Sequence, residues 1–252
     1  MIIPHKLKNI ALIPVRLGSR RLPRKALLEI SGKPCLQILI ERIKTVKNLD
    51  DIIVCTTKNK SDDELIEFLN KIKIKSFRGD EKDILLRFKK SIETYDVENI
   101  VIIDGDDIFC EPNFISKTID ELEHNECDCI QWINLPFGVT PFGFKKNALL
   151  KICSLKKTNN TETGWIRFFT NLDSLKIKQI SSEEPELCQP KIRLTLDYPE
   201  DLDLLKKLFK KLPENFTLKN IVELFSASDN EFKINNKLNK KYWKNFYQNT
   251  QT

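Results

Sequence analysis

The sequence predicts an α/β protein with a mostly parallel sheet, helices on both faces of that sheet and an irregular insertion. Two patterns in the chain predict this fold class. Short apolar segments, typical of buried strands, alternate with segments whose apolar residues recur every three or four positions, as on one face of a helix. Because each helix carries the chain back to start another strand in the same direction, this alternation favours a parallel sheet.

The expected elements of the first half follow the alternation closely. We expect strands over residues 10–14, 51–56, 72–77, 99–103 and 128–133. We expect helices over residues 34–46, 82–95 and 112–124, and one after Ser61, where residues 61–64 resemble a capping box. The helix over 34–46 is indicated by leucine and isoleucine residues that fall on one face.

The second half is less regular. Glycine and proline interrupt residues 137–144, which suit either a strand or a loop. Further along we expect helices over 145–154, 164–171, 199–211, 219–225 and 240–247, and strands over 176–180 and 191–196. With no internal repeat or low-complexity linker, residues 1–252 predict one domain, with an insertion over about 135–190 and a helical C-terminal tail over about 213–252.

The composition argues against several classes of function. The net charge of +6 is spread over the chain without a long block of like charge, so we expect no nucleic-acid partner. No apolar run approaches the roughly 20 residues that span a bilayer, so we expect no membrane partner. Seven scattered cysteines indicate reduced thiols and a cytoplasmic location, and the presence of only two histidines argues against a zinc site.

A basic loop follows the first expected strand. Residues 16–25 hold five arginine and lysine residues together with Gly18 and Ser19, and the segment 31–34 (Ser-Gly-Lys-Pro) lies just beyond. A strand that leads into a basic, glycine-containing loop is suited to phosphate, because backbone N–H groups and cationic side chains can both approach the anion. The spacing is neither that of a Walker A loop nor that of a dinucleotide fingerprint. A solvated or nucleic-acid-facing loop is the alternative.

Carboxylates follow two later strands. Asp104, Asp106 and Asp107 come directly after the strand over 99–103, and Asp197 follows the expected strand over 191–196. Taken separately, they could cap loops or, for Asp197, the next helix. A parallel sheet can bring these strand ends together beside the basic loop. Two aspartates, a magnesium ion and a basic loop are the parts of a nucleotidyl-transfer site.

Four motifs, in order between about residues 9 and 211, together resemble the cytidylyltransferases that activate acidic sugars. These include CMP-KDO synthetases, acylneuraminate cytidylyltransferases and, especially, the SpsF-like branch. The motifs are the loop over 13–25 with Gly-Lys-Pro at 32–34, the segment 79–88, the Gly-Asp pair at 105–106 and the segment 193–201. The sequence departs from the family at 105–108, where Gly-Asp-Asp-Ile adds a carboxylate and lacks the usual proline.

The resemblance implies a Rossmann-like nucleotide-diphospho-sugar transferase fold and a cytoplasmic homodimer that serves cell-surface polysaccharide synthesis. It implies transfer of CMP from CTP, with Mg²⁺, to a hydroxyl of a small sugar. Carried over by position, the catalytic residues are Arg16, Lys25 and Asp106, and the metal ligands are Asp106 and Asp197. The nucleotide contacts implied are Pro14, Arg16, Gly18, Ser19, Arg20, Lys25, Arg78, Asp83 and Arg87.

The acceptor is the least defined part of this interpretation. Residues 161–169 could form an acceptor wall that includes Glu162, Trp165 and Arg167, with Arg167 suited to a carboxylate. Core or dimer packing is the alternative for the aromatic residues of this segment. The sequence also leaves open a phosphorylated polyol or a phosphonate as acceptor, a non-catalytic nucleotide-binding role, and selectivity for cytosine over uracil.

Overall fold

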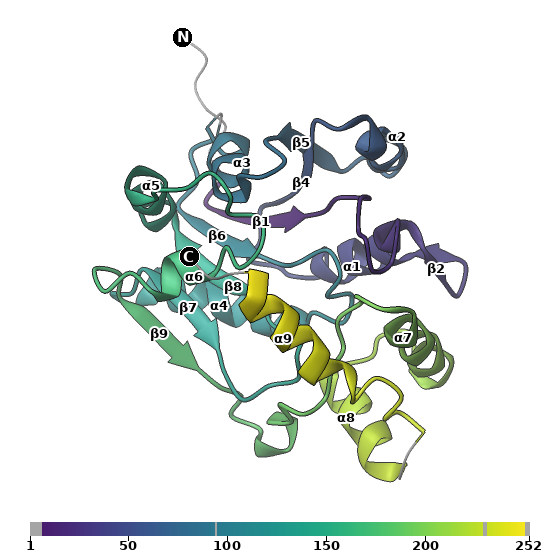
Figure 1. Ribbon diagram of the computed structural model, residues 1–252. Helices are drawn as coiled ribbons and strands as arrows, with labels where there is room; N and C mark the ends of the chain where they lie inside the picture. The colour runs from purple at the N-terminus through teal and green to yellow at the C-terminus, as the bar shows by residue number, and fades with distance from the viewer. Residues whose placement is uncertain (1–6, 94, 229–230, 250–252) are drawn as a thin grey trace.

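The protein is an α/β fold built on one large twisted sheet (Figure 1). The structure, a computed structural model, describes residues 7–93, 95–228 and 231–249. Within these residues the sheet has seven strands in the order β5-β4-β1-β6-β8-β7-β9. They are β1 (Asn9–Pro14), β4 (Asp51–Thr57), β5 (Lys75–Gly79), β6 (Asn99–Ile102), β7 (Cys129–Trp132), β8 (Phe142–Lys145) and β9 (Ile177–Ile180), and a small hairpin joins β2 (Glu29–Ile30) to β3 (Lys33–Pro34).

The sheet is mostly parallel, as the alternation predicts. β1 pairs in parallel with both β4 and β6, so that Ile10 lies opposite Asp51 on one side and Ile100 on the other. β5 and β9 also pair in parallel with their neighbours, β4 and β7. Only β8 differs, because it runs antiparallel between β6 and β7. The carboxyl ends of β1 and β6 are therefore adjacent at the middle of one sheet edge.

Helices cover both faces. They are α1 (Cys35–Ile43), α2 (Asp63–Lys71), α3 (Ile84–Ser91), α4 (Pro112–His124), α5 (Lys146–Leu155), α6 (Arg167–Thr170), α7 (Pro199–Lys211), α8 (Leu218–Ala227) and α9 (Leu238–Asn249). Alternate residues of β1 point to opposite faces. Ala11 and Ile13 join the core beneath α1, α2, α4, α7 and α8, whereas Ile10 and Leu12 join the core beneath α3, α5 and α6.

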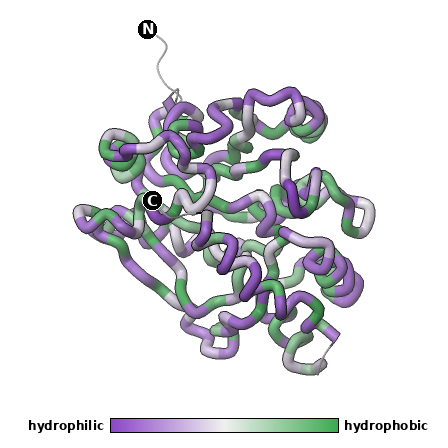
Figure 2. Tube along the Cα trace, viewed as in Figure 1, coloured by the Kyte–Doolittle hydropathy of each residue, from purple (hydrophilic) through white to green (hydrophobic). Residues whose placement is uncertain are grey.

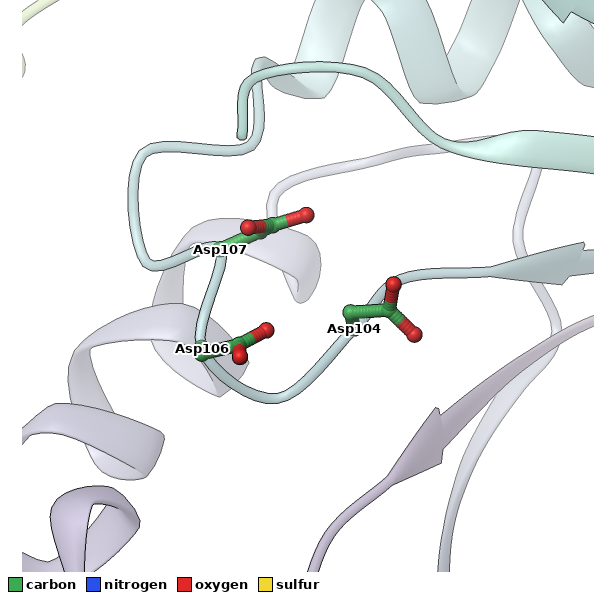
Figure 3. Close-up of side chains that lie close together, drawn as sticks. All are labelled: Asp104, Asp106 and Asp107. Carbon is green, nitrogen blue, oxygen red and sulfur yellow. The ribbon is translucent and has the colours of Figure 1, made fainter. Parts of the chain in front are cut away.

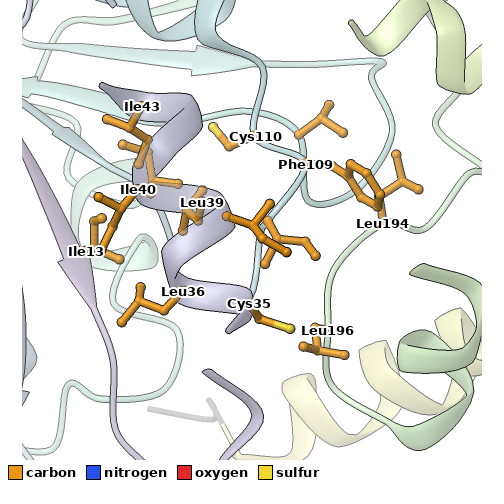
Figure 4. Packing of buried hydrophobic residues seen from close by; sticks show 14 of the residues in the cluster. Ile13, Cys35, Leu36, Leu39, Ile40, Ile43, Phe109, Cys110, Leu194 and Leu196 are labelled. Atoms are coloured by element: carbon orange, nitrogen blue, oxygen red, sulfur yellow. The ribbon is translucent and has the colours of Figure 1, made fainter. Parts of the chain in front are cut away.

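The core beneath α1 also anchors a segment from the far end of the chain. Leu36, Leu39 and Ile40 of α1 are buried close to Ile13 of β1 (Figure 4). Leu194 and Leu196 insert into the same core from the other side. Hydrophobic residues are frequent along the central strands, and hydrophilic ones predominate on the outer turns of the helices (Figure 2). The apolar core therefore fixes the stretch that carries Asp197.

Three expected elements show the differences from the structure that matter most here. The strand expected over 72–77 begins at Lys75, because Lys73 adopts a left-handed turn, with φ +56°, after α2. Residues 191–196 are not a strand: they make a single bridge, between Phe137 and Arg193, and the amide of Leu196 donates to Asp106. Thr94, inside the helix expected over 82–95, lies outside the described residues, and α3 ends at Ser91.

The capping box expected over 61–64 is also absent. Asp62 is the N-cap residue of α2, but its side chain does not cap that helix. Its carboxylate binds other groups, which are described with the site below. Among the helices that the structure describes, none is long and apolar enough to cross a membrane. All seven cysteines are free thiols.

Gly105 provides a test of how tightly the two central strand ends pack. A Cβ at this position would lie 2.4 Å from Val15 Cγ2 and 3.0 Å from the carbonyl oxygen of Pro14. We expect Gly105→Ala to lower the free energy of unfolding by about 1–3 kcal/mol, as overpacking does. Denaturant unfolding measures it. Gly18→Ala is the matched control, because a Cβ at Gly18 meets nothing within 4 Å; an equal loss in both variants would contradict this packing.

Candidate active site

The basic loop leaves β1 and is held by its backbone. The amide of Val15 donates to the carbonyl of Cys55 at 3.0 Å, and the amide of Arg24 donates to the carbonyl of Leu17 at 3.1 Å. The second bond closes the loop, which then enters a short 3₁₀ helix, Lys25–Leu27. Lys25 thus starts a regular element at the base of the loop, and its side chain turns toward the end of β6.

Asp62 anchors this loop from below. Its buried carboxylate accepts the amide of Leu17 at 2.8 Å and the hydroxyl of Thr56 at 3.0 Å, together with the amide and hydroxyl of Thr57. Four donors around one carboxylate compensate for its burial. The loop is therefore tied to the end of β4 by a side chain that would otherwise be costly to bury.

Three carboxylates follow β6 in one turn. Asp104, Asp106 and Asp107 each offer an oxygen within 4.8 Å of the others, and Figure 3 shows Asp106 and Asp107 on the turn that follows Asp104. Burial, followed by the charge of Asp106, raises the pKa of Asp104 to about 7. Burial and the charges of Asp106 and Asp104 likewise raise the pKa of Asp107 well above its usual range. Burial and the repulsion between these carboxylates therefore both disfavour the ionised forms of Asp104 and Asp107.

Lys25 joins the basic loop to this turn and to Asp197. Its ammonium forms an ion pair with Asp106 and lies 2.9 Å from Asp197 Oδ1. Arg21 Nη2 lies 2.5 Å from the same Asp197 oxygen. Burial opposes the charged form of Asp197, but Lys25 and Arg21 outweigh it and hold the pKa of Asp197 well below its usual range. One ammonium therefore meets carboxylates from two separate segments.

A second arginine holds Asp197 from behind. Arg193 is fully buried, and its Nη2 lies 3.1 Å from Asp197 Oδ2. Arg193 also pairs with Asp201 through Nε, at 3.0 Å, and Nη2, at 3.1 Å. The Asp201 carboxylate accepts the amides of Asp197 and Tyr198 at the start of α7. The two oxygens of Asp197 are thus directed to opposite sides, with Oδ1 toward Lys25.

These residues suit a hard divalent cation. Asp106 and Asp197 both reach one cationic centre, the Lys25 ammonium, so their oxygens converge on a common point. Mg²⁺ is bound through one or two carboxylates, with the rest of its octahedron completed by water and phosphate oxygens. Asp104 and Asp107 lie beside this pair. The donor set is all oxygen, which suits Mg²⁺ or Mn²⁺ rather than zinc.

A separate ion-pair group lies on the other side of the loop. Glu162 pairs with Arg87 and lies 3.4 Å from Arg16 Nε. Arg87 is fully buried, and its Nε and Nη1 have no hydrogen-bond partner among the described residues. Burial raises the pKa of Glu162 although both arginines oppose the shift. The structure thus links Arg16 of the loop to the segment 161–169.

Asp83 and Arg78, expected to contact nucleotide, have partners within the protein. Asp83 caps α3 by accepting the amide of Leu86 at 3.1 Å, and it also accepts the hydroxyl of Thr161 at 2.9 Å. Arg78 donates to the carbonyls of Thr57 at 2.9 Å and Asn59 at 2.7 Å. In the structure both side chains therefore hold loops together, and a nucleotide contact stays a prediction for each.

The remaining predicted residues lie in the segment 161–169, at the end of β1 and in the basic loop. Trp165 is buried against Phe88, Phe142 and Phe169, and its indole beside Asp104 opposes the rise in the pKa of that carboxyl. Arg167 begins α6. Pro14 ends β1, and Gly18, Ser19 and Arg20 lie in the loop, with Arg20 exposed. The structure brings together Lys25, Asp106 and Asp197, and separately Arg16, Arg87 and Glu162.

The model of the family described as Cytidylyltransferase matches residues 10–238, which include every residue described above around the basic loop and the carboxylates. The chain belongs to the cytidylyltransferase family. The predicted resemblance is therefore confirmed, and the protein is a nucleotidyltransferase of the CTP-using class. The fold agrees, because a cytidylyltransferase from Leptospira borgpetersenii superposes with a TM-score of 0.79 at 23% identity, over 88% of this chain and 94% of that one.

Sequence relatives extend over most of this cytidylyltransferase. An uncharacterized protein of Methanocaldococcus jannaschii is 35% identical over 217 residues, which are 85% of this chain and 87% of the relative. The spore coat polysaccharide biosynthesis protein SpsF of Bacillus subtilis is 27% identical over 208 residues, which are 81% of this chain and 87% of SpsF. The second match supports the predicted resemblance to the SpsF-like branch.

Several residues that the structure places around Asp197 and the basic loop were not selected from the sequence. It selected Arg20, whereas Arg21 pairs with Asp197. The motif itself held the signal, because the arginine directly before Leu-Pro at 22–23 is Arg21. Asp62 lies within the segment that was expected to form a capping box, and no contact with the basic loop was predicted for it. Arg193 and Asp201 stood in the fourth motif without an assigned role, although a buried arginine and aspartate at this spacing suit a pair.

Asp62 gives a direct test of how the loop is held. Asp62→Asn places an amide group against donors that now face a carboxylate, so we expect the free energy of unfolding to fall by about 1–3 kcal/mol, with weaker CTP binding as the loop loosens. Denaturant unfolding and calorimetry measure the two effects. Asp203→Asn is the matched control, because Asp203 is exposed on α7. Equal stability of the two variants would show that Asp62 does not anchor the loop.

Proposed function

We propose that this cytidylyltransferase transfers CMP from CTP to a hydroxyl of an acidic sugar and releases pyrophosphate. The observation that carries the proposal is the position of Lys25, whose ammonium touches Asp106 and lies 2.9 Å from Asp197. A phosphate-binding loop and a pair of metal-binding carboxylates are thereby brought to one point. Nucleotidyl transfer requires these two halves together, because charge develops on the α-phosphate and on the departing pyrophosphate.

The chain's own residues position the reaction. Lys25 and Arg21 sit where the triphosphate charge would be, and Arg16 lies at the opening of the loop. The sugar hydroxyl oxygen forms a bond to the α-phosphorus and loses its proton, while the bond from that phosphorus to the bridging oxygen breaks and pyrophosphate leaves. Asp62 holds the loop in place. The backbone N–H groups of the loop would donate to the phosphate oxygens, and its cationic side chains would offset the charge on them.

A magnesium ion held by Asp106 and Asp197 would neutralise the phosphate oxygens as charge develops on them. With the ion bound, Lys25 is free to turn from the two carboxylates toward phosphate. Arg193 and Asp201 keep Asp197 directed to the same point throughout. The two carboxylates are thus arranged for a cation before any nucleotide enters.

The proposed acceptor wall is the segment 161–169. The position of Trp165 beside Asp104 and the pairing of Glu162 with Arg16 bring this segment to the edge of the nucleotide site. Arg167 at the start of α6 is the proposed partner for the sugar carboxylate. The similarity to a polysaccharide biosynthesis protein supports a sugar acceptor, and we propose a cytoplasmic homodimer that serves cell-surface polysaccharide synthesis.

A pyrophosphate-release assay tests the reaction. With CTP and Mg²⁺, we expect release that depends on one member of a panel of ulosonic acids and is abolished by EDTA. UTP in place of CTP measures the selectivity for the base. Release that depends only on a phosphorylated polyol or a phosphonate would replace the acceptor class. Absence of release with every acceptor, in protein that binds CTP, would favour a non-catalytic role.

Two substitutions test the site within that assay. We expect Lys25→Ala and Asp106→Asn each to lower the rate of pyrophosphate release by about 100-fold or more, because each removes charge stabilisation at the reacting phosphates. Lys75→Ala and Asp51→Asn are matched controls, since this pair joins β4 and β5 at the surface. Full activity of either site variant would overturn the assignment.

A further inference from the structure

The C-terminal helix reaches the carboxylate site. In Figure 1, α9 lies across the molecule between β8 and α7. Tyr242 of α9 lies against the buried guanidinium of Arg193, with 4.9 Å from the carbon to the ring centre. Phe137 and Tyr198 also contact that guanidinium, at 5.4 Å and 5.8 Å. Three aromatic rings from separate parts of the chain therefore enclose the arginine that holds Asp197.

α9 also contacts Arg21, the arginine that binds Oδ1 of Asp197. Arg21 lies 5.7 Å from the ring centre of Tyr242 and 5.3 Å from that of Tyr198. Arg21 and Arg193 each bind one oxygen of Asp197. Tyr242 therefore contacts both arginines, as Tyr198 does. Aromatic faces attract guanidinium groups and shield them from water, more strongly when the contact is buried.

A buried asparagine ties the segment before α9 to this group. Asn235 is almost fully buried, and its amide donates to Asp201 Oδ1 at 2.7 Å and to the carbonyl of Arg193 at 3.1 Å. Asp201 is the partner of Arg193 and accepts the amide of Asp197. The C-terminal segment thus contacts the support of Asp197 at two points, Asn235 and Tyr242.

We propose that α9 is part of the active site and that Tyr242 is a positioning residue for Asp197. The Tyr242 ring holds Arg21 and Arg193 on the two oxygens of Asp197, and so fixes the carboxylate for a divalent cation. This inference rests on the proposed function only in taking Asp197 as a metal ligand. Groups that orient metal ligands from outside the coordination shell commonly change metal affinity by 10- to 100-fold when they are removed.

Binding of Mn²⁺, followed by electron paramagnetic resonance of the free ion, tests the proposal without any turnover. We expect Tyr242→Ala to weaken Mn²⁺ binding by about 10-fold. Tyr242→Phe keeps the aromatic ring, so we expect it to bind Mn²⁺ with wild-type affinity. Tyr247→Ala is the matched control: Tyr247 lies on the same helix, is 58% exposed and contacts rings of α9, so we expect wild-type affinity. Tyr242→Leu, which fills the site without an aromatic face, weakens binding if Tyr242→Ala does not fold.

The outcomes separate the two proposals. In the pyrophosphate assay we expect the concentration of Mg²⁺ for half-maximal rate to rise in Tyr242→Ala, with a smaller change in kcat. Unchanged Mn²⁺ affinity in a folded Tyr242→Ala or Tyr242→Leu protein would overturn the inference, as would equal loss in Tyr247→Ala. Weakened Mn²⁺ binding in protein that shows no transfer with any acceptor would support the inference and count against the proposed function.

Discussion

The contact of Lys25 with Asp106 and Asp197 is the interaction on which the rest of this structure depends. Four aspartates gather at the ends of β6 and of the segment 193–197, and like charges at this density oppose each other and their own burial. A cation between Asp106 and Asp197 offsets that repulsion. In the protein alone the Lys25 ammonium is this cation, and in the proposed reaction a metal ion would replace it between the two carboxylates.

The surrounding structure keeps both partners of that contact in place. The loop that carries Lys25 is tied down by Asp62, and the segment that carries Asp197 is held by Leu194 and Leu196 in the core and by Arg193. The Asp62 carboxylate and the Arg193 guanidinium among these supports are buried and hydrogen-bonded. In the proposed function the supports form a preorganised frame around one exchangeable charge, which is the arrangement that electrostatic catalysis requires.

Local patterns predicted the central strands, most helices and the residues that meet at the sheet edge, because these follow from short-range periodicity and from motifs. The segment 191–196 was wrongly expected to be a strand: its apolar alternation reflects insertion into a core, with one bridge to Phe137. The Tyr242 contact could not be predicted, because nothing near α9 in sequence specifies that it packs on Arg193. Contacts of this kind depend on tertiary packing between distant segments.

A crystal structure with CTP and Mn²⁺, with the ion located by anomalous scattering, would show directly whether Asp106 and Asp197 share one cation beside the bound triphosphate. We expect an anomalous peak from a Mn²⁺ ion between Asp106 and Asp197 that also contacts phosphate oxygens, with the Lys25 ammonium moved from the carboxylates to the triphosphate. A nucleotide bound away from the loop over 16–25 would contradict this expectation. So would a metal ion that contacts neither Asp106 nor Asp197.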